Sequence, residues 1–169
     1  MRLGTELSKK HNSGAVEFYR GDATALGDHD SIGYLIKLAN QTIMRSLDSR
    51  LQPYGLTAPQ WVPLMVLSKN RANTVAGCAN EIGVDTGAMT RMLDRLEAKG
   101  FISRSRSTDD RRVVNVRLTK GGEAIVKLIP PAICEVLNSH LCGFSKQEFN
   151  IFKDLLGRFL ANGDRLREV

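Results

Sequence analysis

Apolar residues recur at intervals of three or four along most of this chain, and the pattern changes at one place only. Intervals of three or four put side chains on one face of an α-helix, whereas strands are short and follow a different period. The strand-like segments are 101–106 and 113–118, with helical segments on both sides. The sequence therefore predicts a mainly α-helical fold that contains one small β-hairpin.

Residues that begin or end helices set the boundaries of four predicted helices before the hairpin. Ser31 is a suitable N-cap for a long first helix, which ends before Gly55. Thr57 caps the second helix. The third helix is expected over 73–82 and the fourth over 85–99, followed by a glycine that stops it.

Two more helices are predicted after the hairpin. Thr119 caps the first of them, and the adjacent prolines at 130–131 predict a kink inside it. Ser145 and Glu148 have the spacing of a capping box and begin the last helix. Residues 1–30 are polar and irregular, so we expect an N-terminal arm outside the domain.

Several classes of function lack their sequence signals. No uncharged apolar run approaches the roughly 18 residues that a membrane span needs. The first 30 residues lack the apolar middle of a secretion signal, so a cytoplasmic protein is expected. No G-x-S-x-G, phosphate-binding glycine loop or H-E-x-x-H motif is present, so no enzyme, catalytic residue or cofactor is expected.

The cysteines are few and carry no metal-binding pattern. Cys134, His140 and Cys142 are near one another in sequence, but their spacing does not match that of a zinc site. The third cysteine is Cys78, and an odd count argues against a disulfide framework. We therefore expect no metal, and we interpret all three cysteines as small, mostly buried apolar residues.

Positive charge is concentrated in one fifth of the chain. The whole chain has a net charge of +6. Residues 86–120 hold nine basic and four acidic residues, a net of +5, and the rest of the chain holds 15 basic and 14 acidic residues. A concentrated basic surface suits a polyanion, because neutralised phosphates release condensed counterions. The charge therefore favours a nucleic-acid partner, although a solvated helix face remains an alternative.

The third and fourth predicted helices have the arrangement of a helix-turn-helix, with a tight turn at 83–85. A recognition helix presents the residues of its first turns to base edges in the major groove. The candidates there are small, hydrogen-bonding or basic: Thr86, Gly87, Ala88, Thr90 and Arg91, with Arg95 one turn further on. The alternative is that Arg91 and Arg95 pair with Asp94 or Glu97 on an exposed helix.

The predicted hairpin carries Asp110, Arg111 and Arg112 near its tip. An arginine on a thin hairpin can enter a narrow minor groove, where the negative potential attracts it. Asp110 is expected to hydrogen-bond the tip and aim the arginine, or else to be an ordinary turn aspartate. The succession of helix, turn, helix and basic hairpin predicts DNA binding more specifically than a basic helix alone.

These segments resemble the MarR family of winged-helix transcriptional regulators. The resemblance rests on the stretch DTGAMTRMLDRLEAKG at 85–100, on Asp-Arg-Arg at 110–112 in the hairpin and on Leu-Thr-Lys-Gly at 118–121. Gly-Leu-Thr at 55–57, followed by Gln60 and Trp61, is also similar to the start of the family's second helix. The resemblance covers roughly residues 31–160.

The resemblance implies one domain over 31–169: a winged helix-turn-helix lobe at 57–118, with dimerisation helices at 31–52 and 119–162. It implies a homodimer, most often a repressor, that reads a near-palindromic operator in double-stranded DNA. Independently, the apolar stripes at 32–51 and 149–159 need partners that one small core could hardly supply. A protein that coats nucleic acid without sequence preference or effector control is the alternative.

The resemblance also implies roles for individual residues in DNA binding. Thr86, Thr90 and Arg91 would lie at bases or phosphates, and Arg95 near the backbone. Arg112 would enter the minor groove, and Asp110 would brace the hairpin, which is the wing of this fold.

Family members often respond to a small aromatic or phenolic acid, and an aromatic wall, a hydroxyl and a cation suit such a ligand. The candidate lining residues are His29, Ser31, Tyr34, Trp61 and Arg104. Trp61 is alternatively a core residue, and Tyr34 an interface residue. Peroxide sensing by a first-helix thiol is disfavoured, because no cysteine precedes Cys78.

Overall fold

The computed structural model describes residues 18–19, 31–108 and 110–166. The chain divides into two units, Met1–Asn40 and Gln41–Val169, and the first long helix contains the boundary between them. Most of the predicted N-terminal arm, including His29, lies outside the described residues.

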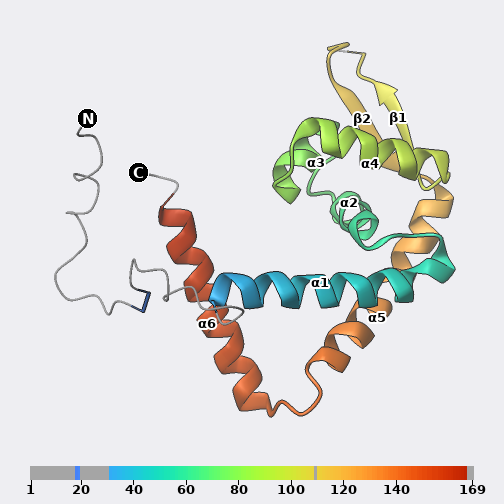
Figure 1. Ribbon diagram of the computed structural model, residues 1–169. Coiled ribbons are helices and arrows are strands. Elements are labelled where there is room, and N and C mark those ends of the chain that lie inside the picture. Colours follow the sequence, from blue (N-terminus) through green and yellow to red (C-terminus); the bar gives the residue numbers. More distant parts are fainter. Residues whose placement is uncertain (1–17, 20–30, 109, 167–169) are drawn as a thin grey trace, which may run out of the picture. The chain divides into compact units, whose positions relative to one another are not determined.

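The order of elements agrees with the sequence prediction (Figure 1). The helices before the hairpin are α1 (Ile32–Leu51), α2 (Trp61–Ser68), α3 (Val75–Ile82) and α4 (Thr86–Ala98), with short 3-10 turns at Gln52–Tyr54 and Ala58–Gln60. The hairpin consists of β1 (Ile102–Arg106) and β2 (Val114–Leu118), and α5 (Lys120–His140) and α6 (Lys146–Arg165) follow it. The fold class is therefore confirmed as mainly α with a two-stranded antiparallel hairpin.

Most of the predicted caps are present, but Thr57 precedes the 3-10 turn Ala58–Gln60, and α2 begins only at Trp61, without a side-chain cap. The side chains of Thr74, Asp85 and Thr119 accept hydrogen bonds from backbone N–H groups at the starts of α3, α4 and α5. Ser145 and Glu148 form the capping box of α6. Because these caps satisfy otherwise unpaired N–H groups, the short polar residues before each apolar stripe fix where the helices begin.

The hairpin is held at its base by the core and by a third segment of backbone. Ile102 and Val116 are 2% and 1% exposed. The N–H of Val116 donates to the carbonyl of Asn73 at 2.8 Å, and Thr74 forms an antiparallel bridge with Asn115. The connection from α2 to α3 therefore pairs with β2 on the side away from β1.

The buried core joins the lobe to the end of α1 and to α5. Fully buried side chains come from α1, α2, α4, β2 and α5: Leu51, Leu64, Met89, Leu93, Leu96, Val116 and Ile129. Helix α5 is continuous through Pro130 and Pro131, where the sequence predicted a kink. Its buried face consists of Ile129, Ala132 and Val136, one or two turns apart.

The interpretation of all three cysteines as buried is wrong for two of them. Cys78 is buried in α3, whereas Cys134 and Cys142 are exposed. Cys134 lies on α5 between Ala132 and Val136 in sequence, so it points away from the face that these residues bury. Composition alone does not reveal which face of a helix a cysteine occupies.

Helix α6 lies apart from α2, α3 and α4 in Figure 1 and has no buried residue. Its apolar side is half exposed: Ile151, Phe152, Leu155, Phe159 and Leu160 are 49–59% accessible. None of the described helices is long and apolar enough to cross a membrane. The apolar side of α6 is only partly covered by the other described residues.

Candidate nucleic-acid interface

A glycine turn sets the angle between α3 and α4. Gly83 adopts a left-handed φ of 76°, and its N–H and that of Val84 both donate to the carbonyl of Ala79, at 2.9 and 3.1 Å. Asp85 then caps α4 by accepting from the N–H of Ala88 at 2.8 Å. The predicted helix-turn-helix is thus formed by a C-cap and an N-cap in immediate succession.

The two faces of α4 are divided as the sequence predicted. Met89, Leu93 and Leu96 are buried. The candidate reading residues lie on the other side: Thr86, Gly87, Arg91 and Arg95 are exposed, and Ala88 and Thr90 are half-buried. Their contacts with DNA stay a prediction, but they share the accessible face of one helix.

Two details affect what this face can offer a ligand. The hydroxyl of Thr90 donates to the carbonyl of Thr86 at 2.8 Å, which leaves its oxygen lone pairs as acceptors. An ideal Cβ at Gly87 would lie 3.6 Å from an Arg91 guanidinium nitrogen. The same Cβ would lie 3.1 Å from Asp85 Oδ1, so a larger residue at 87 would crowd the carboxylate that caps α4 and add bulk to the accessible face of the helix.

The alternative in which Arg91 and Arg95 pair with Asp94 or Glu97 is not what the structure shows. Within the described part of the chain, neither arginine forms an ion pair, and both carboxylates pair with Arg104 of β1 instead. The charges of Arg91 and Arg95 are therefore available to a polyanion.

Arg104 makes a dense set of contacts with α4. One of its terminal nitrogens lies 2.6 Å from Glu97 Oε2 and 2.7 Å from Asp94 Oδ1. Its Nε and backbone N–H donate to the two oxygens of Glu97 at 2.9 and 3.0 Å. These hydrogen bonds lower the pKa of the Glu97 carboxyl and raise the pKa of the Arg104 guanidinium. Arg104 already has two carboxylate partners, which makes it a poorer receptor for an acidic effector than the sequence suggested.

The tip of the hairpin is closed by Asp110. Its carboxylate accepts from the N–H of Arg112 at 2.9 Å, and its carbonyl accepts from the N–H of Val113 at 2.9 Å. Arg111 and Arg112 are exposed beside it. Asp110 therefore hydrogen-bonds the tip as expected, in the manner of a turn aspartate, and holds the backbone of the arginine proposed for the minor groove.

The predicted effector residues are distributed over both units of the chain. Ser31 accepts from the N–H of Tyr34 at 3.2 Å at the start of α1, in the first unit. Trp61 lies in the second unit, half-buried against the core, and its buried indole N–H has no hydrogen-bond partner among the residues that the structure describes. His29 lies outside the described residues, and this set of five stays a prediction.

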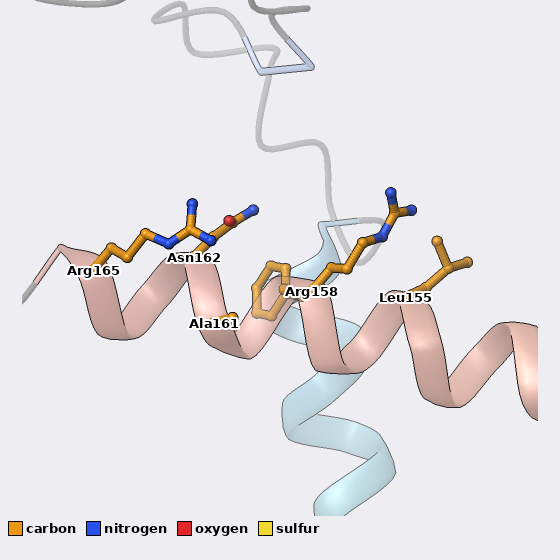
Figure 2. Close-up of a pocket in the computed structure, with 6 residues that line it drawn as sticks. Leu155, Arg158, Ala161, Asn162 and Arg165 are labelled. Carbon is orange, nitrogen blue, oxygen red and sulfur yellow. The ribbon is translucent and has the colours of Figure 1, made fainter.

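Two features escaped the sequence analysis. Lys99 Nζ donates to the carbonyl of Gly55 at 2.6 Å and to Gln60 Oε1 at 2.8 Å, which ties the end of α4 to the connection between α1 and α2. A groove of about 500 Å³ runs along α6, and Figure 2 shows Arg158, Asn162 and Arg165 projecting from one side of that helix. Gln60 is buried and so needs a hydrogen-bond partner, which Lys99 supplies. No local sequence pattern indicates the groove along α6.

A helix-turn-helix followed by a basic hairpin and two long helices defines a winged-helix protein. The family model described as "MarR family" matches residues 56–114. The multiple antibiotic resistance protein MarR of Escherichia coli is 36% identical over 110 residues, which are 65% of this chain and 76% of that protein. The chain therefore belongs to the MarR family of winged-helix transcriptional regulators, a family of regulators and not of enzymes.

Solved structures agree with this assignment. Apo wild-type MarR from E. coli is 31% identical with a TM-score of 0.66, over 79% of this chain and 98% of that chain. A mutant E. coli MarR complexed with operator DNA is 32% identical with a TM-score of 0.71, over 76% and 93%. The MepR–DNA complex of S. aureus is 22% identical with a TM-score of 0.72, over 78% and 98%, and supports the fold alone.

Proposed function

We propose that this protein binds a near-palindromic operator in double-stranded DNA as a homodimer and represses transcription there. Each α4 would occupy a major groove, with Thr86, Gly87, Ala88, Thr90, Arg91 and Arg95 toward the DNA, and each wing a neighbouring minor groove. Two recognition helices on a two-fold dimer read half-sites about 34 Å apart, one DNA turn. We also propose that it acts in the cytoplasm, where its bacterial relatives would meet chromosomal DNA.

The observation that supports this function most is the basic face of α4, which forms no ion pair among the described residues, together with the exposed arginines of the wing. Arg91 and Arg95 have no carboxylate partner among the described residues, although two carboxylates lie on the same helix. Arg111 and Arg112 are exposed on the hairpin that follows. The operator complex of the E. coli relative supports the same use of this fold.

The operator preference of the dimer is the first prediction. A duplex selected by this protein from a random library should contain an inverted repeat with half-sites one turn apart. Specific readers bind their site at least about 10³-fold more tightly than other DNA. Fluorescence anisotropy at about 150 mM salt, with a scrambled duplex of the same composition as the control, measures the ratio. Near-equal affinities would instead support the alternative of a non-specific nucleic-acid-binding protein.

We propose that 31–52 and 119–162 are the dimerisation helices and 57–118 the DNA-binding lobe. A helix whose apolar side is exposed along its length signals an interaction surface. On α6 this side includes Phe152, Leu155 and Phe159, and a second copy of the chain offers the same side in return.

Phe152→Glu is therefore expected to convert the dimer into monomers, because a carboxylate would be buried in an apolar interface. Light scattering after size exclusion measures the mass. Asn150→Glu is the matched control, since it adds the same charge to the exposed opposite side of α6. A dimer that survives Phe152→Glu, or is lost equally in both variants, would contradict this use of α6.

We further propose that a small aromatic or phenolic acid releases the DNA, with His29, Ser31, Tyr34, Trp61 and Arg104 as lining candidates. The indole N–H of Trp61 has no acceptor within the described part of the chain, which favours a ligand with an acceptor oxygen. Trp61 is the only tryptophan, so its fluorescence reports binding directly. Aromatic acids should change this fluorescence and lower operator affinity, whereas aliphatic acids of equal charge should do neither. If no aromatic acid releases the operator, this effector class is wrong.

A further inference from the structure

The contacts of Arg104 on β1 connect the wing to α4, the recognition helix. Asp94 and Glu97 lie three residues apart on α4, and the side chain of Arg104 contacts both. The Glu97 carboxylate also accepts the backbone N–H of Arg104, so it binds the strand itself and not only its side chain. The Arg104 side chain is 23% exposed, which limits the competition from water.

The short connection between α4 and β1 leaves the angle of the hairpin to be set by such contacts. Gly100 has a left-handed φ of 73°, and the N–H groups of Gly100 and Phe101 donate to the carbonyls of Glu97 and Leu96. This is a Schellman motif, which ends the helix and fixes where the strand begins. The core then holds Ile102, and beyond it Arg104 is the next inward contact toward the tip.

We propose that Asp94, Glu97 and Arg104 form a clamp that fixes the direction of the wing relative to the recognition helix, and so positions Arg112 for the minor groove. This inference rests on the proposed DNA-binding function. The three residues act through Arg112 and are positioning residues.

The clamp is separable from the stability of the fold. The base of the hairpin is already fixed by buried Ile102 and Val116 and by the pairing of Asn73 with Val116. Partly exposed ion pairs contribute little to folding stability. The clamp has a second electrostatic consequence, because Arg104 compensates two carboxylates that would otherwise face a polyanion from α4.

Glu97→Gln separates the loss of positioning from the loss of negative charge, because the first should weaken operator recognition and the second should strengthen DNA binding. Removal of a negative charge from α4 should raise the affinity for any duplex. Loss of the clamp should instead lower the preference for the operator over the scrambled duplex, by roughly tenfold, within the range found for residues coupled through one network. Glu81→Gln on α3 is the matched control, since it removes the same charge and breaks the exposed ion pair between Glu81 and Arg71.

A double-mutant cycle measures the energetic coupling between Glu97 and Arg112 in operator binding. A purely structural role of Glu97 would not produce such a coupling. Arg112→Ala should weaken operator binding strongly in the wild-type protein and at most a third as much in the Glu97→Gln background, although no described contact joins the two side chains. Melting temperatures should show that both proteins are folded. Additive losses, or an unchanged operator preference in Glu97→Gln, would overturn the clamp.

Arg104→Lys tests the electrostatic alternative. Lysine keeps the positive charge beside Asp94 and Glu97 but lacks the guanidinium fork that spans them. The clamp predicts a loss of operator preference like that of Glu97→Gln, and full wild-type behaviour would overturn it. A wild-type protein that fails to distinguish the two duplexes would overturn the proposed function, and the clamp with it. Wild-type preference with additive variants overturns the clamp alone.

Discussion

Gly122→Ala is expected to destabilise the protein by about 3 kcal/mol, the upper end of the usual cost of overpacking. An ideal Cβ at this position would lie 1.9 Å from the carbonyl oxygen of Phe101 and 3.0 Å from its carbon. The clash involves backbone, which cannot rotate away as the end of a flexible side chain can.

Both backbone segments at this contact are fixed. The N–H of Thr119 donates to the same Phe101 carbonyl at 3.0 Å, and the Thr119 hydroxyl donates to the carbonyl of Gly100 at 2.6 Å. Relief of the clash would therefore pull the start of α5 away from the end of α4 and the base of the wing.

Thermal unfolding measures the effect, with an expected fall in Tm of about 6–12 °C for a chain of this size. Gly121→Ala is the control, because its Cβ would meet no atom closer than 3.4 Å. Alanine also favours a helix over glycine by up to about 1 kcal/mol, so the control should be neutral or stabilising. Equal melting temperatures for the two variants would show that the close approach of Gly122 to Phe101 does not constrain the fold.

Arg112→Ala is expected to weaken operator binding by about 30-fold or more. Each arginine that contacts DNA contributes about 1–3 kcal/mol, and a dimer loses two of them. The side chain is exposed at the wing tip, and the hydrogen bond to Asp110 uses its backbone N–H, which alanine retains. Dimer mass and Tm should therefore stay unchanged while the affinity falls.

Arg117→Ala on β2 removes the same charge from the exposed surface of the same hairpin and serves as the control. A general electrostatic role predicts similar losses for both variants, with a shallower salt dependence of binding. A minor-groove role predicts a larger loss for Arg112→Ala, and the loss should depend on the sequence of the contacted base pairs. Unchanged affinity in anisotropy titrations would remove Arg112 from the interface.

The parts of the fold that depend on local sequence could be predicted. Thr119 and Ser145 cap the helices that they were expected to cap, and Thr74 and Asp85 cap α3 and α4 at the predicted starts of those helices. A capping bond joins residues two or three apart, so its information lies within one turn of chain. The buried and exposed faces of α4 follow from helical periodicity for the same reason.

The partner of Asp94 and Glu97 could not be predicted from spacing. Arg91 lies three residues before Asp94, a spacing at which helical side chains often pair, whereas Arg95 is only one residue from Asp94 and two from Glu97. The turn at Gly100 instead brings Arg104 back beside α4, with three hydrogen bonds to Glu97 that no helical neighbour could make. The exposure of Cys134 and Cys142 likewise depends on which faces other elements cover.

The pairing of the α2–α3 connection with β2 has a consequence for how this fold tolerates length changes. Asn73 and Thr74 meet Asn115 and Val116 in antiparallel register. One inserted residue in that connection would slip the register by a position, and a one-residue slip turns inward side chains outward. The length of a surface connection that is remote in sequence from the wing therefore helps to set the register of β2. A change in that length would alter the shape of the surface that contacts DNA.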